Sequence, residues 1–198
     1  MDKFLRETKY VDFSNPLIRE KTEELFNEVD SDTEKARIAY EFVRDEIPHT
    51  FDINSAIITA KASDVLKYRT GICHAKSNLL AALLRSQNIP TGFCFEHLCL
   101  AEDESLGYCV HAFNAAFLEG KWVQLDARGN KKGVCAEFSL GKPILAYPPR
   151  IGFDEYFFEG IYADSHIETM KMLESAKTLD DIIENIPEFV TKKADIIL

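Results

Sequence analysis

Cys73 is placed to act as a nucleophile on a carbonyl carbon. It follows Gly71 and begins a Leu-rich segment with helical spacing. Backbone N–H groups at the start of a helix lack helical partners, so they favour a thiolate over a thiol and are available to an oxyanion. Gly71 would let a substrate approach closely. Taken alone, Cys73 also fits a second interpretation, a small side chain buried at a helix start, because free cysteines are commonly buried and inert.

His111 and Asp126 are the residues that would serve such a nucleophile. His111 lies in the run Cys109–Phe113, where a strand would hold it rigidly as a general base. Asp126 ends the next strand-like run, Trp122–Asp126. Each has a structural alternative: a core histidine bonded to a carbonyl group, and an aspartate that serves a turn before Gly129.

The spacing of these two residues favours the chemical interpretation. Glu119-Gly120 is a plausible two-residue turn between the two strand-like runs. Counting outwards from that turn, Phe113 lies opposite Asp126. His111 and Asp126 are then diagonal neighbours on one face of a hairpin, within side-chain reach. A slip of one residue would put them on opposite faces.

Together the three residues suit one mechanism. His111 takes the proton of Cys73, which gives a thiolate–imidazolium pair, and Asp126 orients the ring and stabilises its charge. The thiolate attacks an amide or ester carbonyl and forms a thioester. Water or an amine then releases the acyl group.

The elements that must position these residues are predicted from spacing and turn residues. A capping box of Ser31 and Glu34 starts the first helix, and helical pattern returns from Asp164, with Pro187 interrupting it. Helices come first and strands follow, which predicts an α+β domain with an antiparallel sheet. The predicted helices cover residues 32–47, 63–68 and 73–87, and the strand-like runs cover 93–98, 108–118 and 121–126.

Composition limits the class of protein and its partners. The 198 residues carry a net charge of −10, which disfavours nucleic acids and anionic membrane surfaces as partners. The five cysteines are an odd number, there is no apolar signal core at the start, and no apolar run approaches the roughly 20 residues of a membrane span. We therefore expect a protein of the reducing cytoplasm. We expect a single domain over 1–198, with a core at about 31–130 and helical or loop extensions packed on it.

At this point three motifs resemble those of the transglutaminase-like superfamily. The Cys, His and Asp motifs are Gly71–Ser77, His111–Phe113 and Trp122–Asp126, in that order. The resemblance covers about Ala62 to Arg128, and Ile47–Asp52 is similar to the region before the Cys motif in bacterial members. It implies a papain-like fold, with the Cys helix packed on an antiparallel sheet, and acyl transfer through a thioester without a cofactor. The superfamily includes protein cross-linkers, peptidases, peptide N-glycanases and members that have lost catalysis.

Other residues are candidates for smaller roles. His49 and the hydroxyl of Tyr68 are candidates to bind substrate or donate to an oxyanion, with ordinary packing as the alternative for each. His74 follows the nucleophile on a helix, so its ring should point about 100° away and it is not assigned as the base. Cys94, His97 and Cys99 lack a metal-ligand spacing, so no metal is predicted. Part of the aromatic-rich segment 147–162 is expected to line or cover the cleft beside Cys73, and a loop that closes the far side of the core is the alternative.

Two classes of function follow. The first is an enzyme that cleaves or transfers amide acyl groups, acting on a peptide, an isopeptide or a glutamine side chain. Its partners would be a peptide or protein-derived amide and, for transfer, a small amine acceptor. The second is a peptide-binding module on the same scaffold with little or no turnover. The three intact residue types favour the enzyme, and the short chain favours a peptidase or amidase over a protein cross-linker.

Overall fold

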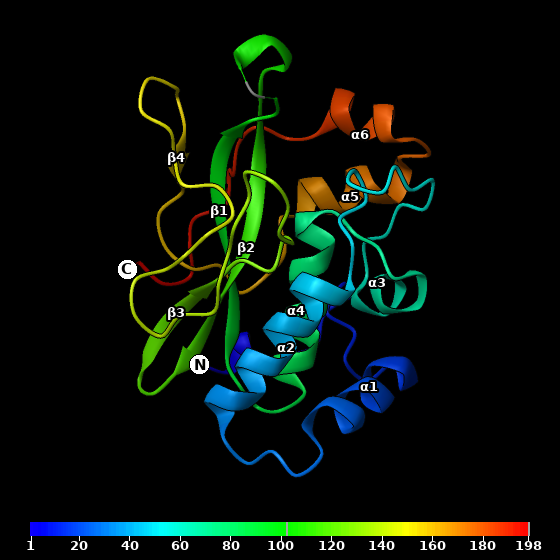
Figure 1. Cartoon of the computed structure of the whole chain (residues 1–198), viewed down its shortest axis with the longest axis vertical. Coiled ribbons are helices and arrows are strands. Elements are labelled where there is room, and N and C mark those ends of the chain that lie inside the picture. Colours follow the sequence, from blue (N-terminus) through cyan, green and yellow to red (C-terminus); the bar gives the residue numbers. More distant parts are fainter. Residues whose placement is uncertain (102, 198) are drawn as a thin grey trace.

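The computed structural model describes residues 1–101 and 103–197. Helices pack on a four-stranded antiparallel sheet (Figure 1). The α+β arrangement is therefore confirmed. No helix in the described ranges is long and apolar enough to cross a membrane. The sheet order is β3-β2-β1-β4. The elements are α1 (Pro16–Phe26), α2 (Asp32–Glu46), α3 (Ala62–Tyr68), α4 (Cys73–Arg85), β1 (Thr91–Cys99), β2 (Tyr108–Leu118), β3 (Lys121–Leu125), β4 (Tyr156–Phe157), α5 (Ile167–Ser175) and α6 (Leu179–Asn185).

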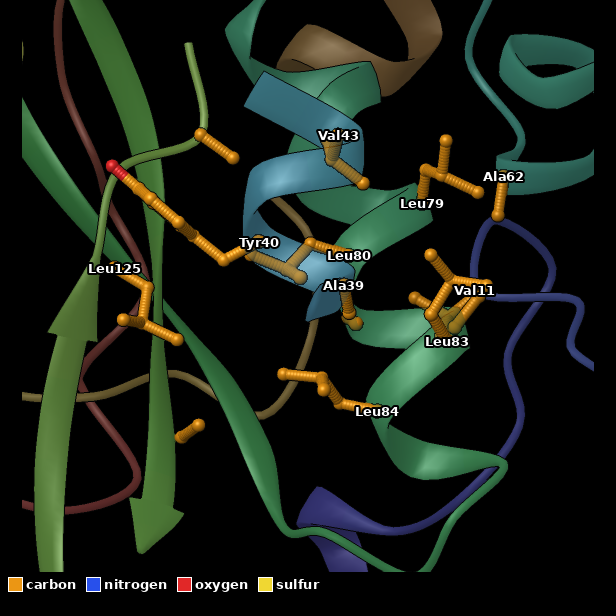
Figure 2. Close-up of a cluster of buried hydrophobic side chains, with 14 of the residues drawn as sticks. Val11, Ala39, Tyr40, Val43, Ala62, Leu79, Leu80, Leu83, Leu84 and Leu125 are labelled. Carbon is orange, nitrogen blue, oxygen red and sulfur yellow. The ribbon is translucent and has the colours of Figure 1, made fainter. Parts of the chain in front are cut away.

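Helix α4 is the centre of the core. All 13 of its residues are buried, because α2 and α3 cover one side and the sheet covers the other. Figure 2 shows leucines of α4 in one buried cluster with Ala39, Tyr40 and Val43 of α2 and Leu125 of β3. Each fully buried leucine contributes roughly 1.5–3 kcal/mol. The helix that begins at Cys73 is therefore a rigid platform. The leucines are Leu79, Leu80, Leu83 and Leu84.

The hairpin of β2 and β3 has the predicted register. Glu119 and Gly120 both have positive φ, at 51° and 79°, as a tight hairpin turn requires. Leu118 lies opposite Lys121, and the pairing ends with Asn114 opposite Leu125. Beyond that point β2 continues towards Tyr108 without β3 beside it. One edge of β2 is therefore open to other partners over its first half.

The first turns of α4 occupy this open edge. His74 Nε2 donates to the carbonyl oxygen of Val110 at 2.7 Å, and Ser77 Oγ donates to that of Ala112 at 3.2 Å. The N–H of Val110 donates to Pro187 O at 2.8 Å, so the segment after α6 also binds this edge. Backbone groups of a sheet edge need partners when buried. Their satisfaction by α4 fixes the start of that helix against β2.

Some local predictions need correction. Ser31 caps α2 by accepting from Glu34 N–H, but the Glu34 carboxylate pairs with Arg37, so the reciprocal half of the capping box does not form. The C-terminal helical region is broken between α5 and α6, where a Thr178–Asp181 capping box starts a new helix, and Pro187 lies beyond both helices. Sequence reasoning also missed α1 and the two-residue β4.

Candidate active site

Cys73 is the first residue of α4 and is buried, at 9% exposure. Its thiol lies at the open edge of β2, where it interacts with the His111 ring and the Ala112 N–H. Burial raises the pKa of the thiol, but the charge of His111, a hydrogen bond with its ring and the Ala112 N–H lower it, and the net shift is downward. The position therefore favours a thiolate.

His111 and Asp126 lie on one face of the hairpin. His111 Nε2 and Asp126 Oδ2 are 3.0 Å apart, and both side chains are almost fully buried. Asp126 also accepts from Arg128 N–H at 3.1 Å and from Ala146 N–H at 3.0 Å. Burial raises the pKa of Asp126, yet His111 and these donors bring it below its usual value. The carboxylate is therefore ionised and held in place by three donors.

The charge on His111 follows from its two neighbours. Burial lowers the pKa of the imidazole, but the Asp126 carboxylate and the Cys73 thiolate raise it, and the net direction is well above the usual value. Since Nε2 faces Asp126, Nδ1 is the nitrogen available to Cys73. The three side chains form a continuous series, thiol, imidazole and carboxylate, from the start of a helix and two adjacent strands.

His49 lies beside the nucleophile. Its Nε2 accepts the backbone N–H of Cys73 at 3.2 Å, so its own proton is on Nδ1. Nδ1 has no hydrogen-bond partner among the described residues. Burial, and then the positive charge of Arg128, hold the pKa of His49 well below its usual value. The structure thus brings His49 into the site. Its ring accepts a hydrogen bond from the Cys73 N–H, the group that was expected to bind an oxyanion.

Tyr68 and Gly71 are placed differently. Tyr68 is 43% exposed at the end of α3, with the Lys67 ammonium over its ring, and no described contact joins it to Cys73. A Cβ at Gly71 would meet side-chain atoms of its own fold at 3.2–3.3 Å, from Thr59, Val65 and Ala75. Glycine is thus explained here by the close packing of α3 and α4. A role in substrate approach stays a prediction.

Charged side chains lie around His49 and the Tyr147 ring. Arg128 makes a bidentate ion pair with Asp52, which also binds Lys131. Arg128 also lies over the ring of Tyr147, and that ring meets His111 edge-on at 5.3 Å. Tyr147 therefore covers His111, as expected for part of the segment 147–162.

Lys76 fixes the segment that carries His49. It lies one turn after Cys73, is 1% exposed, and donates through Nζ to the carbonyl oxygen of Ile47. Burial lowers the pKa of this amine to about 7. Because Ile47 is two residues before His49, the bond holds His49 against the start of α4. Sequence reasoning missed this contact and the Arg128–Asp52 pair.

Glu96 is another residue that sequence reasoning missed. It lies on β1 directly opposite His111 in the antiparallel register, and it is fully buried. The available signal was a carboxylate inside the apolar run that begins at Phe93.

His74, Cys94 and His97 make structural contacts outside this series. His74 is bonded to Val110 and stacks on Phe95, and burial lowers its pKa to about 3, which agrees with its exclusion as the base. Cys94 lies in an apolar cluster, whereas His97 is stacked between Tyr108 and Tyr156. Within the described ranges, no group of three or more His, Cys, Asp or Glu side chains is arranged to hold a metal ion.

Comparisons with known proteins place this geometry in a family. The profile of the transglutaminase-like superfamily matches residues 19–127, which is more than half of the chain. Among solved structures, a candidate cysteine protease from Cytophaga hutchinsonii is 19% identical over 63% of this chain and 40% of its own, with a TM-score of 0.48. A candidate protease from Parabacteroides distasonis is 17% identical over 63% of this chain and 24% of its own, with a TM-score of 0.40. This chain thus spans less than half of either protein.

No curated protein sequence matches the chain at a significant level. The family match spans α2, α3, α4 and the β2–β3 hairpin, which carry Cys73, His111 and Asp126. The mixed helix and antiparallel sheet arrangement is the papain-like fold that the resemblance implied. The chain belongs to the transglutaminase-like superfamily.

Proposed function

We propose that the chain is a cysteine-dependent enzyme that hydrolyses or transfers the acyl group of an amide through a thioester. Cys73 is the nucleophile, His111 the general base and acid, and Asp126 the residue that orients the imidazole. The observation that carries the proposal is the continuous series of thiol, imidazole and carboxylate, with the 3.0 Å bond between His111 and Asp126 at its centre.

The geometry accounts for each step. The Cys73 thiolate attacks the carbonyl carbon, and the resulting oxyanion displaces His49 Nε2 from the Cys73 N–H. With its proton moved from Nδ1 to Nε2, His49 then donates to the same oxyanion. His111 then gives its proton to the leaving nitrogen, and the C–N bond breaks to leave the thioester. Water, deprotonated by His111, cleaves the thioester and restores the thiolate–imidazolium pair. Asp126 remains ionised throughout because three donors hold it.

The acceptor in this proposal is water or a small amine. Cross-linking of two proteins needs a surface that delivers a lysine side chain while excluding water, which is far more concentrated. The Tyr147 ring meets His111 edge-on at 5.3 Å, which limits the space for a bulky acceptor beside the base. A glutamine-containing protein, a labelled amine and water offered together test this point. Cys73-dependent isopeptide bonds between proteins would refute it.

The test of the nucleophile uses two cysteine variants. A p-nitrophenyl ester of a small acid acylates an activated cysteine without specific recognition, so wild type should release one burst of p-nitrophenol and gain the acyl mass. Cys73→Ala should lose both, whereas the control Cys135→Ala, at an exposed free cysteine, should keep both. Iodoacetamide at neutral pH should label Cys73 ahead of the buried thiol of Cys94. A chain that binds peptides without acylation would be the binding module instead.

The compartment is part of the same proposal. All five cysteines are unpaired, and the nucleophile must stay reduced to act. A reducing compartment such as the cytoplasm meets this requirement.

A further inference from the structure

Glu96 is a buried carboxyl group with nothing to bind. Its residue is 0% exposed, and neither side-chain oxygen has a hydrogen-bond partner among the described residues. An unpaired buried polar group costs about 1–3 kcal/mol, and more if charged. Proteins tolerate such groups chiefly at functional sites. The position of Glu96 therefore needs an explanation beyond packing.

That position is beside the proposed general acid. Glu96 lies directly opposite His111 in the β1–β2 register, so both side chains point to the same face of the sheet. Directly opposite side chains have Cβ atoms about 4.5–5.5 Å apart. Asp126 approaches the same ring from β3. His111 thus stands between two carboxyl groups, one from each neighbouring strand.

The two carboxyl groups are in opposite states. Asp126 accepts three hydrogen bonds and is ionised. Burial raises the pKa of Glu96 to about 8, although His111 acts in the other direction. Two carboxyls with environments this different in one site perform different tasks. Asp126 serves the imidazole, which leaves Glu96 without a task in the mechanism.

The surroundings of Glu96 indicate what would satisfy it. On its other side it lies opposite Phe157 of β4, which is 46% exposed and meets the Phe113 ring at 6.1 Å. The nearby guanidinium groups already have carboxylate partners, since Arg150 pairs with Glu155 and Arg128 with Asp52. The missing partner is therefore a cation with an apolar stem, which would lie along the aromatic rings while its charge meets the carboxylate.

The role of His111 indicates which part of the substrate lies beside Glu96. A general acid gives its proton to the leaving nitrogen, so the leaving group lies against His111. A carboxyl group paired with His111 on the same face is then next to the side chain of that leaving group. Phe157 lies opposite Glu96 and is 46% exposed, while the neighbouring Phe158 N–H binds Phe95 O at 3.0 Å, so the Phe157 ring can move without a movement of the backbone.

We propose that Glu96 is a specificity-determining residue that selects substrates whose leaving group carries a cationic side chain, an ammonium or a guanidinium. The proposal rests on the proposed function. The cation converts a neutral, unsatisfied carboxyl into one half of an ion pair. Phe157 and Phe113 contact the alkyl stem of that side chain.

The reverse of the reaction measures this preference without knowledge of the natural acyl group. A p-nitrophenyl ester loads Cys73, and the acyl-enzyme then partitions between water and an added amino acid amide. The α-amine of the amide attacks the thioester, the C–N bond forms, the C–S bond breaks, and His111 takes the proton. Lysine amide and norleucine amide have side chains of similar length, and only the lysine is charged.

We expect wild type to transfer its acyl group to lysine amide at least tenfold better than to norleucine amide. Glu96→Gln should reduce this ratio to about one. Glu159→Gln, at an exposed glutamate on the same segment as Phe157, should keep the preference. Phe157→Ala should raise the KM for both amides several-fold.

The outcomes separate the two proposals. No Cys73-dependent burst would refute the proposed function itself. A burst with equal transfer to the two amides in wild type would refute the role of Glu96 alone, whether or not the Gln variant folds. A lysine preference that survives Glu96→Gln would also refute it.

Discussion

The buried Glu96 carboxyl predicts how the stability of the protein changes with pH. Its pKa is about 8 in the folded chain, against 4.5 for an unperturbed glutamate, mainly because of burial. A raised pKa on an acid means that the unfolded chain loses its proton first. Its contribution to stability is therefore complete below pH 4.5, declines as the pH rises above 4.5, and reaches its full loss above pH 8.

The magnitude follows from the two pKa values. One unit corresponds to 1.36 kcal/mol, so the linkage between pH 5 and pH 8 amounts to about 3 kcal/mol of lost stability. Glu96→Gln removes this titration and keeps the shape of the side chain. The free energy of unfolding of the variant, relative to wild type, should therefore rise by about 3 kcal/mol between pH 5 and pH 8.

Urea unfolding at several pH values measures the difference directly, provided that the slope with urea is the same for both chains. The difference between the two proteins cancels the titration of every other group. Glu159→Gln is the matched control, because it makes the same substitution at an exposed carboxyl. A flat difference for Glu96→Gln would mean that the Glu96 carboxyl is hydrated or paired in solution, and the reasoning would fail.

Three further predictions concern the site. Asp126→Asn should lower kcat by about 10³- to 10⁴-fold. The alkaline limb of its pH–rate profile should also move to lower pH, since the carboxylate no longer raises the pKa of His111; an unmoved limb would exclude the pairing of Asp126 with His111. His49→Ala should slow acylation at least about tenfold, because a shift of the His49 proton to Nε2 would make this ring a second oxyanion donor beside the Cys73 N–H. An unchanged rate of the p-nitrophenol burst would refute this role. Tyr147→Ala should speed alkylation of Cys73 by iodoacetamide, because its ring covers His111; equal rates would show that the ring does not limit access.

The contrast between the hairpin and β1 shows what the sequence was able to predict. A two-residue turn allows one register, so counting from Glu119-Gly120 was enough to bring His111 and Asp126 to one face. The connection from Cys99 to Tyr108 has no such constraint, because a longer loop does not fix the pairing. The alignment of Glu96 with His111 was therefore beyond sequence reasoning.

Contacts between segments that are far apart in the sequence could not be predicted either. Helix α4 was predictable from the spacing of its leucines, but its docking on the open edge of β2 depends on β3 ending at Leu125. Likewise, Lys76 reads as a surface residue of a helix, whereas tertiary packing buries it against Ile47. The capping box failed for a related reason, since Arg37 offered Glu34 a stronger partner than a backbone N–H.

The open edge of β2 also orders the events by which the protein gains its reactivity. His111 and Asp126 are 15 residues apart in a local hairpin, and hairpins form within about 1–10 μs. Cys73 is 38 positions before His111, and it meets that ring only when α4 docks on the edge. Until docking, its sulfur has the ordinary acidity of a free thiol. We therefore expect the nascent chain to carry an unreactive cysteine, and the nucleophile to appear only as the core closes around α4.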